Sequence, residues 1–345
     1  MFLELKIKKI LINLFGGLIF FIISFILIIL VYFEYKEIPI YNFSLAYKFI
    51  KGEQNYTQFK NLAEKLGYNK DDKLLIIHAD DLGLSNSVNN ASFKALNEGN
   101  INSASVMMTC DKIDEVAEFS KKNPEIDLGI HLTVTSEWEF HKWDGVLDSK
   151  EIQSLINKNG NLYENKKGFT VNANVNELKK ELQAQIDLAK SLGINFSHID
   201  SHEGALFYKS EFFKAYLDLA KENKLAVFVP DIVTVQFDKD LIPPSNLVVV
   251  DDFYMAENGM DLNNWEEFYI GILNNLKPGL SQIIVHLGYD DKEMREITID
   301  HPNFGSKWRK YDYDIVSNKK FSQALINNNI KLVNWREIQK VMYPN

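Results

Sequence analysis

The chain has 345 residues, which is enough for one large domain or two ordinary ones with a buried core. Apolar residues make up 46% of it and charged residues 25%, a balance that excludes wholesale disorder. The formal net charge of −9 disfavours nucleic acid as a partner, because no basic surface for a phosphate backbone is apparent. The single cysteine, Cys110, excludes an internal disulfide and a metal site built from cysteines.

An uncharged apolar run occupies residues 14–33 near the N-terminus. As a helix it would be roughly 30 Å long, about the thickness of the hydrocarbon core of a bilayer. Lysines precede it at positions 6, 8 and 9, and no net positive charge follows, so the positive-inside rule places residues 1–13 in the cytoplasm. We therefore expect a single-pass signal anchor with the rest of the chain on the extracytoplasmic side of the membrane. A cleaved signal peptide is the alternative.

In the rest of the chain, the pattern of apolar and polar residues changes at about residue 70. Residues 34–70 are mixed polar and aromatic and predict a stalk and a lead-in helix. From 71 to 345, short apolar runs alternate with amphipathic stretches, which predicts one catalytic α/β domain with a parallel sheet, open or closed into a barrel. A polar stretch at 133–174 interrupts this alternation and predicts a long insertion over one end of the sheet.

The expected strands are nearly continuous apolar runs, as in sheets that are covered on both faces. They lie at 74–79, 104–109, 128–132, 197–201, 226–230, 247–250, 282–286 and 330–332. The expected helices lie at 88–98, 114–122, 175–191, 211–223, 265–276 and 314–328.

Histidines and aspartates stand at the carboxyl ends of four expected strands, where catalytic groups gather in parallel α/β folds. Two imidazoles and one carboxylate are a sufficient ligand set for Zn²⁺ or a comparable divalent ion, with one position left for water. A second carboxylate could then act as the base for that water. The residues concerned are His78, Asp80, Asp81, His131, His202 and His286.

Several of these residues lie in recognisable motifs. The segments HADDLGLSNSVNNA (78–91), INSASVMMT (101–109), GIHLT (129–133) and HIDSH (198–202) together resemble the YdjC-type carbohydrate deacetylases, relatives of the polysaccharide deacetylases. The resemblance extends from about residue 74 to the C-terminus. It implies a distorted (β/α) barrel of the polysaccharide-deacetylase type. It also implies a metal-dependent hydrolase that removes acetyl groups from N-acetylated sugars or a glycan, with a metal-bound water as nucleophile.

The resemblance also implies a role for each matching residue. Asp80 corresponds to the general base and His286 to a general acid. One divalent ion, Mg²⁺ or Zn²⁺, would be bound by Asp81, His131 and His202. Strand alternation places Asp200 on the same face as His202, where it could orient a metal ligand as a hydrogen-bond acceptor.

A later segment, HPNFGSKWRKYDYD, offers an aromatic plane and a bidentate donor to a sugar. We expect Trp308 and Arg309 to contact the substrate, with a packed tryptophan at the start of a helix as the alternative. The chain departs from the family in two places, with Glu203 and Gly204 after the HIDSH motif and Leu287 after His286. These departures concern the substrate more than the metal.

Two other functions remain open on the sequence alone. The same groups could cleave an O-acetyl ester on a glycan, because the ester carbonyl would meet the same site. The chain could also be a membrane-anchored glycan-binding protein without catalysis. The intact set of Asp80, Asp81, His131 and His202 favours the enzyme, since a binding protein needs no base beside the metal. The oligomeric state is not predicted.

Overall fold

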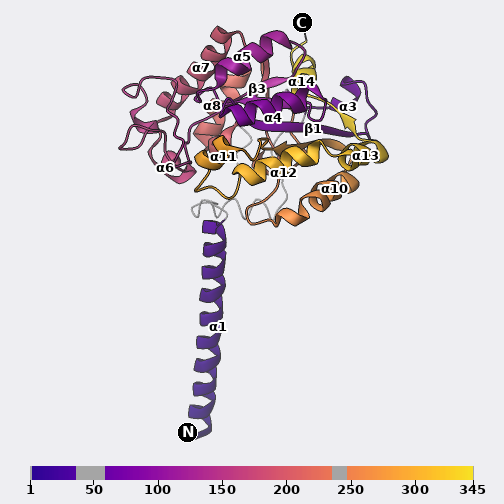
Figure 1. Ribbon diagram of the computed structural model, residues 1–345. Coiled ribbons are helices and arrows are strands. Elements are labelled where there is room, and N and C mark those ends of the chain that lie inside the picture. The colour runs from indigo at the N-terminus through magenta and orange to yellow at the C-terminus, as the bar shows by residue number, and fades with distance from the viewer. Residues whose placement is uncertain (1, 36–58, 235–246, 345) are drawn as a thin grey trace. The chain divides into compact units, whose positions relative to one another are not determined.

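The computed structural model describes residues 2–35, 59–234 and 247–344, in two compact units, Met1–Glu53 and Gln54–Asn345 (Figure 1). The described part of the first unit is helix α1 (Phe2–Tyr35), whose described side chains, at 15–31, are apolar apart from Gly16, Gly17 and Ser24 and largely exposed. Among the described residues, none of the helices has the combination of length and hydropathy that a membrane crossing requires. Most of the expected stalk, residues 36–58, lies outside the described residues.

The second unit is built on a parallel sheet in the order β5-β4-β3-β2-β1-β7-β6, with β8 also paired to β1. All seven strand pairings are parallel, and the sheet has two ends, β5 and β6, so the fold is an open α/β half-barrel. The strands are β1 (Lys73–Leu82), β2 (Ser103–Val106), β3 (Leu128–Leu132), β4 (Phe196–Ser201), β5 (Ala226–Val227), β6 (Asp252–Tyr254), β7 (Gly279–Val285) and β8 (Lys331–Leu332).

Helices cover the sheet and bury their apolar faces against it. Neighbouring helices pack in pairs, α7 with α8, α10 with α13 and α4 with α12 (Figure 1). The helices are α3 (Leu62–Lys65), α4 (Asn86–Asn97), α5 (Ile113–Lys122), α6 (Lys166–Asn172), α7 (Val175–Leu192), α8 (Ser210–Glu222), α9 (Asp231–Thr234), α10 (Trp265–Asn275), α11 (Lys292–Ile297), α12 (Ser306–Val316), α13 (Lys319–Asn327) and α14 (Trp335–Met342). Short 3₁₀ helices lie at η1 (Gln153–Leu155), η2 (His202–Phe207) and η4 (Leu262–Asn264).

Two of the expected elements differ in kind from those in the structure. The apolar run 247–250 does not form a strand; it makes one isolated bridge, from Val250 to Pro230, and the edge strand is β6 instead. The helix expected at 314–328 is two helices, α12 and α13. The break falls at Asn318, whose side-chain oxygen accepts from the backbone N–H of Lys320 and so begins α13.

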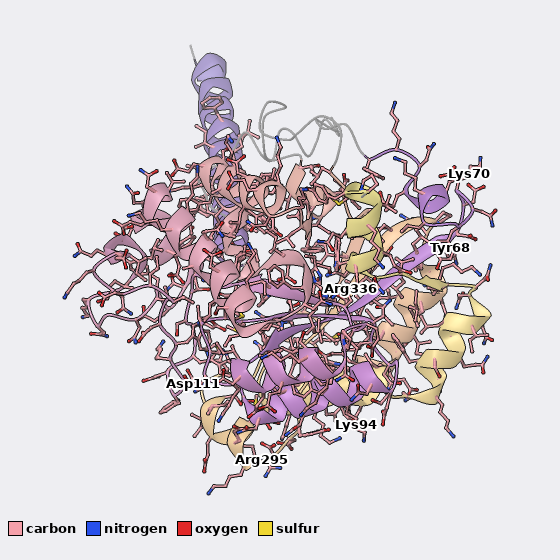
Figure 2. The ribbon with its side chains drawn as sticks, turned by 90° about the horizontal axis from the view of Figure 1, so that it is seen from above. Tyr68, Lys70, Lys94, Asp111, Arg295 and Arg336 are labelled. Atoms are coloured by element: carbon pink, nitrogen blue, oxygen red, sulfur yellow. The ribbon has the colours of Figure 1, made fainter. Side chains whose placement is uncertain are left out.

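Helix α14 was not expected, although its start carries a capping signal. Asn334 and Glu337 form a reciprocal capping box at its first turn. Arg336, labelled in Figure 2, then ties this helix to the segments that lead into β3 and β4. Its Nη2 donates to the backbone carbonyls of Ile126, at 3.1 Å, and Asn195, at 2.7 Å.

Candidate active site

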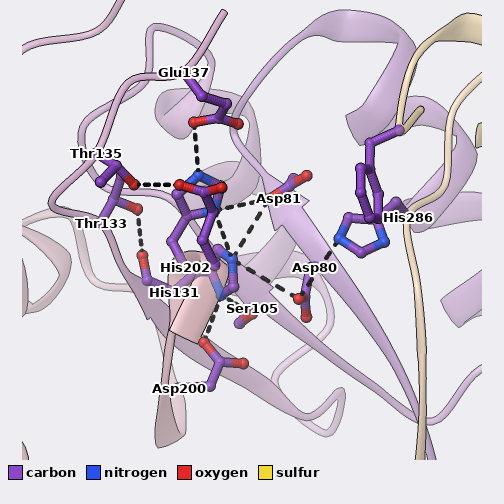
Figure 3. A network of polar contacts seen from close by, with 12 residues as sticks. Asp80, Asp81, Ser105, His131, Thr133, Thr135, Glu137, Asp200, His202 and His286 are labelled. Carbon is purple, nitrogen blue, oxygen red and sulfur yellow. Dashed lines mark hydrogen bonds and ion pairs between the residues drawn. The ribbon is translucent and has the colours of Figure 1, made fainter. Parts of the chain in front are cut away.

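Three side chains from three strand ends converge on one point at the carboxyl edge of the sheet. Oδ1 of Asp81 lies 3.5 Å from Nε2 of His131 and 3.6 Å from Nδ1 of His202, and the two nitrogens are 3.1 Å apart (Figure 3). All three residues are buried. The strand ends that carried histidine or aspartate in the sequence therefore do meet, and the three residues expected as metal ligands are neighbours.

In His131 and in His202, the ring nitrogen that does not face Asp81, here called the far nitrogen, lies beside a carboxylate. Nδ1 of His131 lies 2.7 Å from Oδ1 of Asp200, and Nε2 of His202 lies 3.1 Å from Oε2 of Glu137. A carboxylate accepts from an N–H, so these contacts favour protons on the far nitrogens and leave lone pairs on the two that face Asp81.

The donor set fits a divalent cation. Oδ1 of Asp81 is buried and has no hydrogen-bond partner within the described part of the chain. Two imidazole lone pairs and this carboxylate oxygen therefore point together, an arrangement that a positive charge between them would stabilise. Although burial acts to lower it, the carboxylates of Glu137 and Asp81 raise the pKa of His202 well above its usual value, which reflects the same negative potential.

The two aspartates reach one site because the chain turns between them. Asp81 has a φ of 70°, in the left-handed region, and Gly83 has a φ of 92°. The register of β1 against β2 shifts between Ala79 and Leu82. The turn therefore begins at Asp81 itself, two residues before Gly83, and aspartate is one of the few residue types besides glycine that visit this backbone conformation.

Asp80 lies beside the ligand set. Its Oδ2 is 3.8 Å from Nε2 of His131 and 3.9 Å from Nε2 of His286, and its Oδ1 is 3.3 Å from Nε2 of His78. Burial raises the pKa of Asp80 to about 6, and the charge of Asp200 adds to this, against the lowering effect of His131.

Asp200 contacts two histidines of the site, His131 and His78. Besides binding His131, it places Oδ2 2.9 Å from Nε2 of His78, whose other ring nitrogen contacts the Ser103 hydroxyl at 2.9 Å. His131 and Asp200 are direct register partners in β3 and β4, so the sheet itself fixes this contact. Asp200 thus lies where the alternation of its strand predicted.

His286 follows β7 and forms one wall of the site. Its backbone N–H donates to Oδ2 of Asp312 at 2.8 Å, and its ring packs edge-on against Phe304, with the ring centroids 4.8 Å apart. Burial lowers the pKa of His286 to about 3, and the nearby charge of Arg309 adds to the effect. The ring is therefore neutral at neutral pH.

The placement of Trp308 and Arg309 corrects the sugar-contact expectation. Trp308 is 2% exposed and packs against Trp265 and Phe304, so it matches the alternative of a packed tryptophan. Arg309 is 1% exposed; its Nη2 donates to Oδ2 of Asp81 at 2.6 Å and its Nε to the carbonyl of Phe304. Neither side chain presents a surface to a sugar, because both are committed to contacts inside the domain.

Sequence reasoning missed Glu137. It lies in the polar segment 133–174, which contains η1, α6 and two isolated bridges. The loop between the end of β3 and η1 brings Glu137 over His202 (Figure 3). A single glutamate in a loop carries no periodic or motif signal, so only the fold reveals its position.

Comparisons with known proteins agree with this architecture. The sequence profile described as YdjC-like protein matches residues 74–327. A carbohydrate deacetylase from Thermoanaerobacter pseudethanolicus is 27% identical over 268 residues, covering 76% of this chain and 98% of that protein. A chitooligosaccharide deacetylase from Yersinia enterocolitica is 32% identical over 133 residues, covering 38% of this chain and 49% of that protein.

A solved structure shares the fold. A protein from Enterococcus faecalis, provisionally described as a cellobiose-phosphate cleavage protein, aligns with a TM-score of 0.64 at 19% identity, over 77% of this chain and 99% of that one. Because the profile covers most of the catalytic unit, the resemblance noted from the motifs is confirmed, and the chain belongs to the YdjC-like family.

Proposed function

We propose that the chain is a metal-dependent carbohydrate deacetylase, a hydrolase that cleaves the acetamide of an N-acetylated sugar or glycan and releases acetate. The names of its relatives support the reaction class. The observation that carries the proposal is the convergence of Asp81, His131 and His202 beside a second carboxylate, Asp80. A divalent ion held by these three residues, Mg²⁺ or Zn²⁺, would lower the pKa of water and polarise the acetyl carbonyl.

The second carboxylate suits a general base. With a pKa of about 6, Asp80 is mostly ionised at neutral pH and still basic enough to accept the proton of the attacking water. When the C–N bond breaks, the leaving nitrogen needs one proton. The proton that Asp80 takes from water can supply it, so the reaction requires no other proton source.

His286 lies on the route of that proton. Because its ring is neutral, it can act as an acid only after taking up a proton, and Oδ2 of Asp80 lies 3.9 Å from its Nε2. We assign it the transfer of the proton from Asp80 to the departing amine. Arg309 takes no part in this transfer; it holds Oδ2 of Asp81 and so aims Oδ1 at the two histidines.

Acetate release tests the reaction and its main alternative. The purified protein, loaded in turn with Mg²⁺ and Zn²⁺, is incubated with chitooligosaccharides and with O-acetylated glycans, and acetate is measured. Release from the N-acetylated substrates, abolished by a chelator, supports the proposal. Release only from esters would make the protein an O-acetyl esterase, and stoichiometric glycan binding without turnover would make it a binding protein.

We also propose that the N-terminal segment holds the protein in the membrane with the catalytic domain on the extracytoplasmic side. The support is the uncharged run 14–33, the lysines before it and the helical conformation of α1. Protease added to intact or outer-permeabilised cells should digest the domain while cytoplasmic control proteins survive. A domain that survives together with those controls would reverse the orientation.

A further inference from the structure

Two side chains of the loop after β3 hold the ring of His202. Oε2 of Glu137 lies 3.1 Å from its Nε2, and the Trp143 ring packs edge-on with its centroid 6.1 Å away. We propose that Glu137 is a positioning residue for His202 and that the polar segment 133–174 thereby completes the metal site. This inference rests on the proposed function, because it takes His202 as a metal ligand.

The two histidines are held by equivalent groups on different kinds of element. His131 is oriented by Asp200, its register partner in the neighbouring strand, so the sheet fixes both residues. His202 lies beyond the end of β4, at the first position of η2, and the next residue, Glu203, already has a left-handed φ of 53°. Its orientation therefore depends on the loop that lies over it.

The contact decides which nitrogen can bind a metal. With its N–H donated from Nε2 to Glu137, the neutral His202 ring keeps a lone pair on Nδ1, the atom 3.6 Å from Asp81. Without that acceptor, a proton on Nδ1 becomes equally accessible and removes the donor atom from the site. Carboxylates in this position behind ligating histidines typically change metal affinity about 10–100-fold when removed.

The backbone around Glu137 is held in place for this task. The N–H of Ser136 donates to the carbonyl of Tyr163 at 2.8 Å, and Trp143 donates from Nε1 to the carbonyl of Thr135 at 2.7 Å. The hydroxyl of Thr135 donates to Oε2 of Glu203 at 3.0 Å, which ties the loop to the residue after His202. The loop therefore contacts two successive residues, His202 through Glu137 and Glu203 through Thr135.

Metal binding to the full chain tests the inference without an activity assay. Metal-depleted protein is titrated with Co²⁺, followed by calorimetry and by the visible spectrum of the bound ion, and thermal unfolding checks the fold. Glu137→Ala should bind one Co²⁺ about 10–100-fold more weakly and with an altered spectrum. Glu137→Gln keeps a carbonyl acceptor and should lose less. Glu139→Ala removes an exposed glutamate from the same loop and should match the unmodified protein.

The outcomes separate this inference from the proposed function. If His202→Ala weakens Co²⁺ binding and Glu137→Ala does not, Glu137 does not position His202, although the metal site stands. If His202→Ala also binds normally, the metal site itself is wrong. Glu137, His202 and Glu203 also lie close enough to hold a cation together. Loss of a second bound ion from Glu137→Ala, with the first unaffected, would make Glu137 a ligand and overturn the positioning role.

Discussion

Nη2 of Arg309 lies 2.6 Å from Oδ2 of Asp81, so the carboxylate that faces the two histidines is held from behind by a buried guanidinium. Although burial acts to raise it, this charge holds the pKa of Asp81 well below its ordinary value. The fold joins residues 228 positions apart in the sequence to form this pair.

Breaking the pair should be costly. Arg309→Ala leaves a buried carboxylate without its partner and should lower the free energy of unfolding of the metal-free protein by about 3–5 kcal/mol. Urea denaturation measures this. Arg295→Ala is the control, because Arg295 pairs with Asp290 at the surface, where water screens the ion pair, and its loss should change the free energy of unfolding far less. Equal effects of the two substitutions would mean that the buried pair contributes no more than a surface one.

The aspartate pair should divide metal binding from proton transfer. Asp80→Asn should keep the divalent ion and lose activity by about a hundredfold or more, because a positioned base is gone. Asp81→Asn should lose metal affinity and activity together. Calorimetric metal titration and acetate release on the same preparations check both. If Asp80→Asn loses the ion and Asp81→Asn keeps it, the two roles are exchanged.

Trp308→Ala should change stability rather than substrate binding. The ring is packed inside the domain, so its removal should cost about 3–5 kcal/mol of unfolding free energy. The KM of the folded enzyme for a chitooligosaccharide should change less than about twofold, because the substitution removes no contact with the substrate. A large rise in KM with unchanged stability would restore the sugar-contact role.

Asp312 should make stability fall as the pH rises toward neutrality. Its buried carboxyl accepts from Trp265, Tyr269 and the N–H of His286, and burial raises its pKa from 3.8 to about 7. Between these values the folded protein keeps a proton that the unfolded chain releases. Its contribution is therefore complete below about pH 4 and lost progressively up to about pH 7.

Urea denaturation at pH 4.5 and pH 7 tests this dependence. The advantage in unfolding free energy of the unmodified protein over Asp312→Asn should shrink as the pH rises, by at most about 1.4 kcal/mol per pH unit. The variant is also expected to be less stable at low pH, because an asparagine amide nitrogen cannot accept from the N–H of His286. A difference that stays constant or grows with pH would contradict the raised pKa.

The sheet was largely predictable because strands covered on both faces leave continuous apolar runs. β3 lies at the residues expected, and β1, β4 and β7 differ only at their ends. For the same reason a strand was wrongly predicted at 247–250. This apolar run is buried, as a strand would be, but makes only one bridge. Burial alone therefore does not distinguish a strand from an extended segment.

The candidate site was predictable only where it sits on strand ends. Asp81, His131 and His202 each close a strand, so topology brings them together. Arg309 and Glu137 reach the same point from a helix and a loop, and their contacts depend on how those elements pack over the sheet. No local pattern in the sequence encodes that packing.

The left-handed backbone at Asp81 restricts which residues this position can hold. Aspartate adopts this conformation more readily than glutamate does, and asparagine tolerates it as well as aspartate. Asparagine lacks the negative charge that Arg309 and a cation both require. Aspartate therefore suits both the backbone and the chemistry, and the exchange of Asp81 for glutamate, usually regarded as conservative, would also lengthen the side chain that reaches the two histidines. Position 80 carries no such backbone restriction, because its φ is not positive.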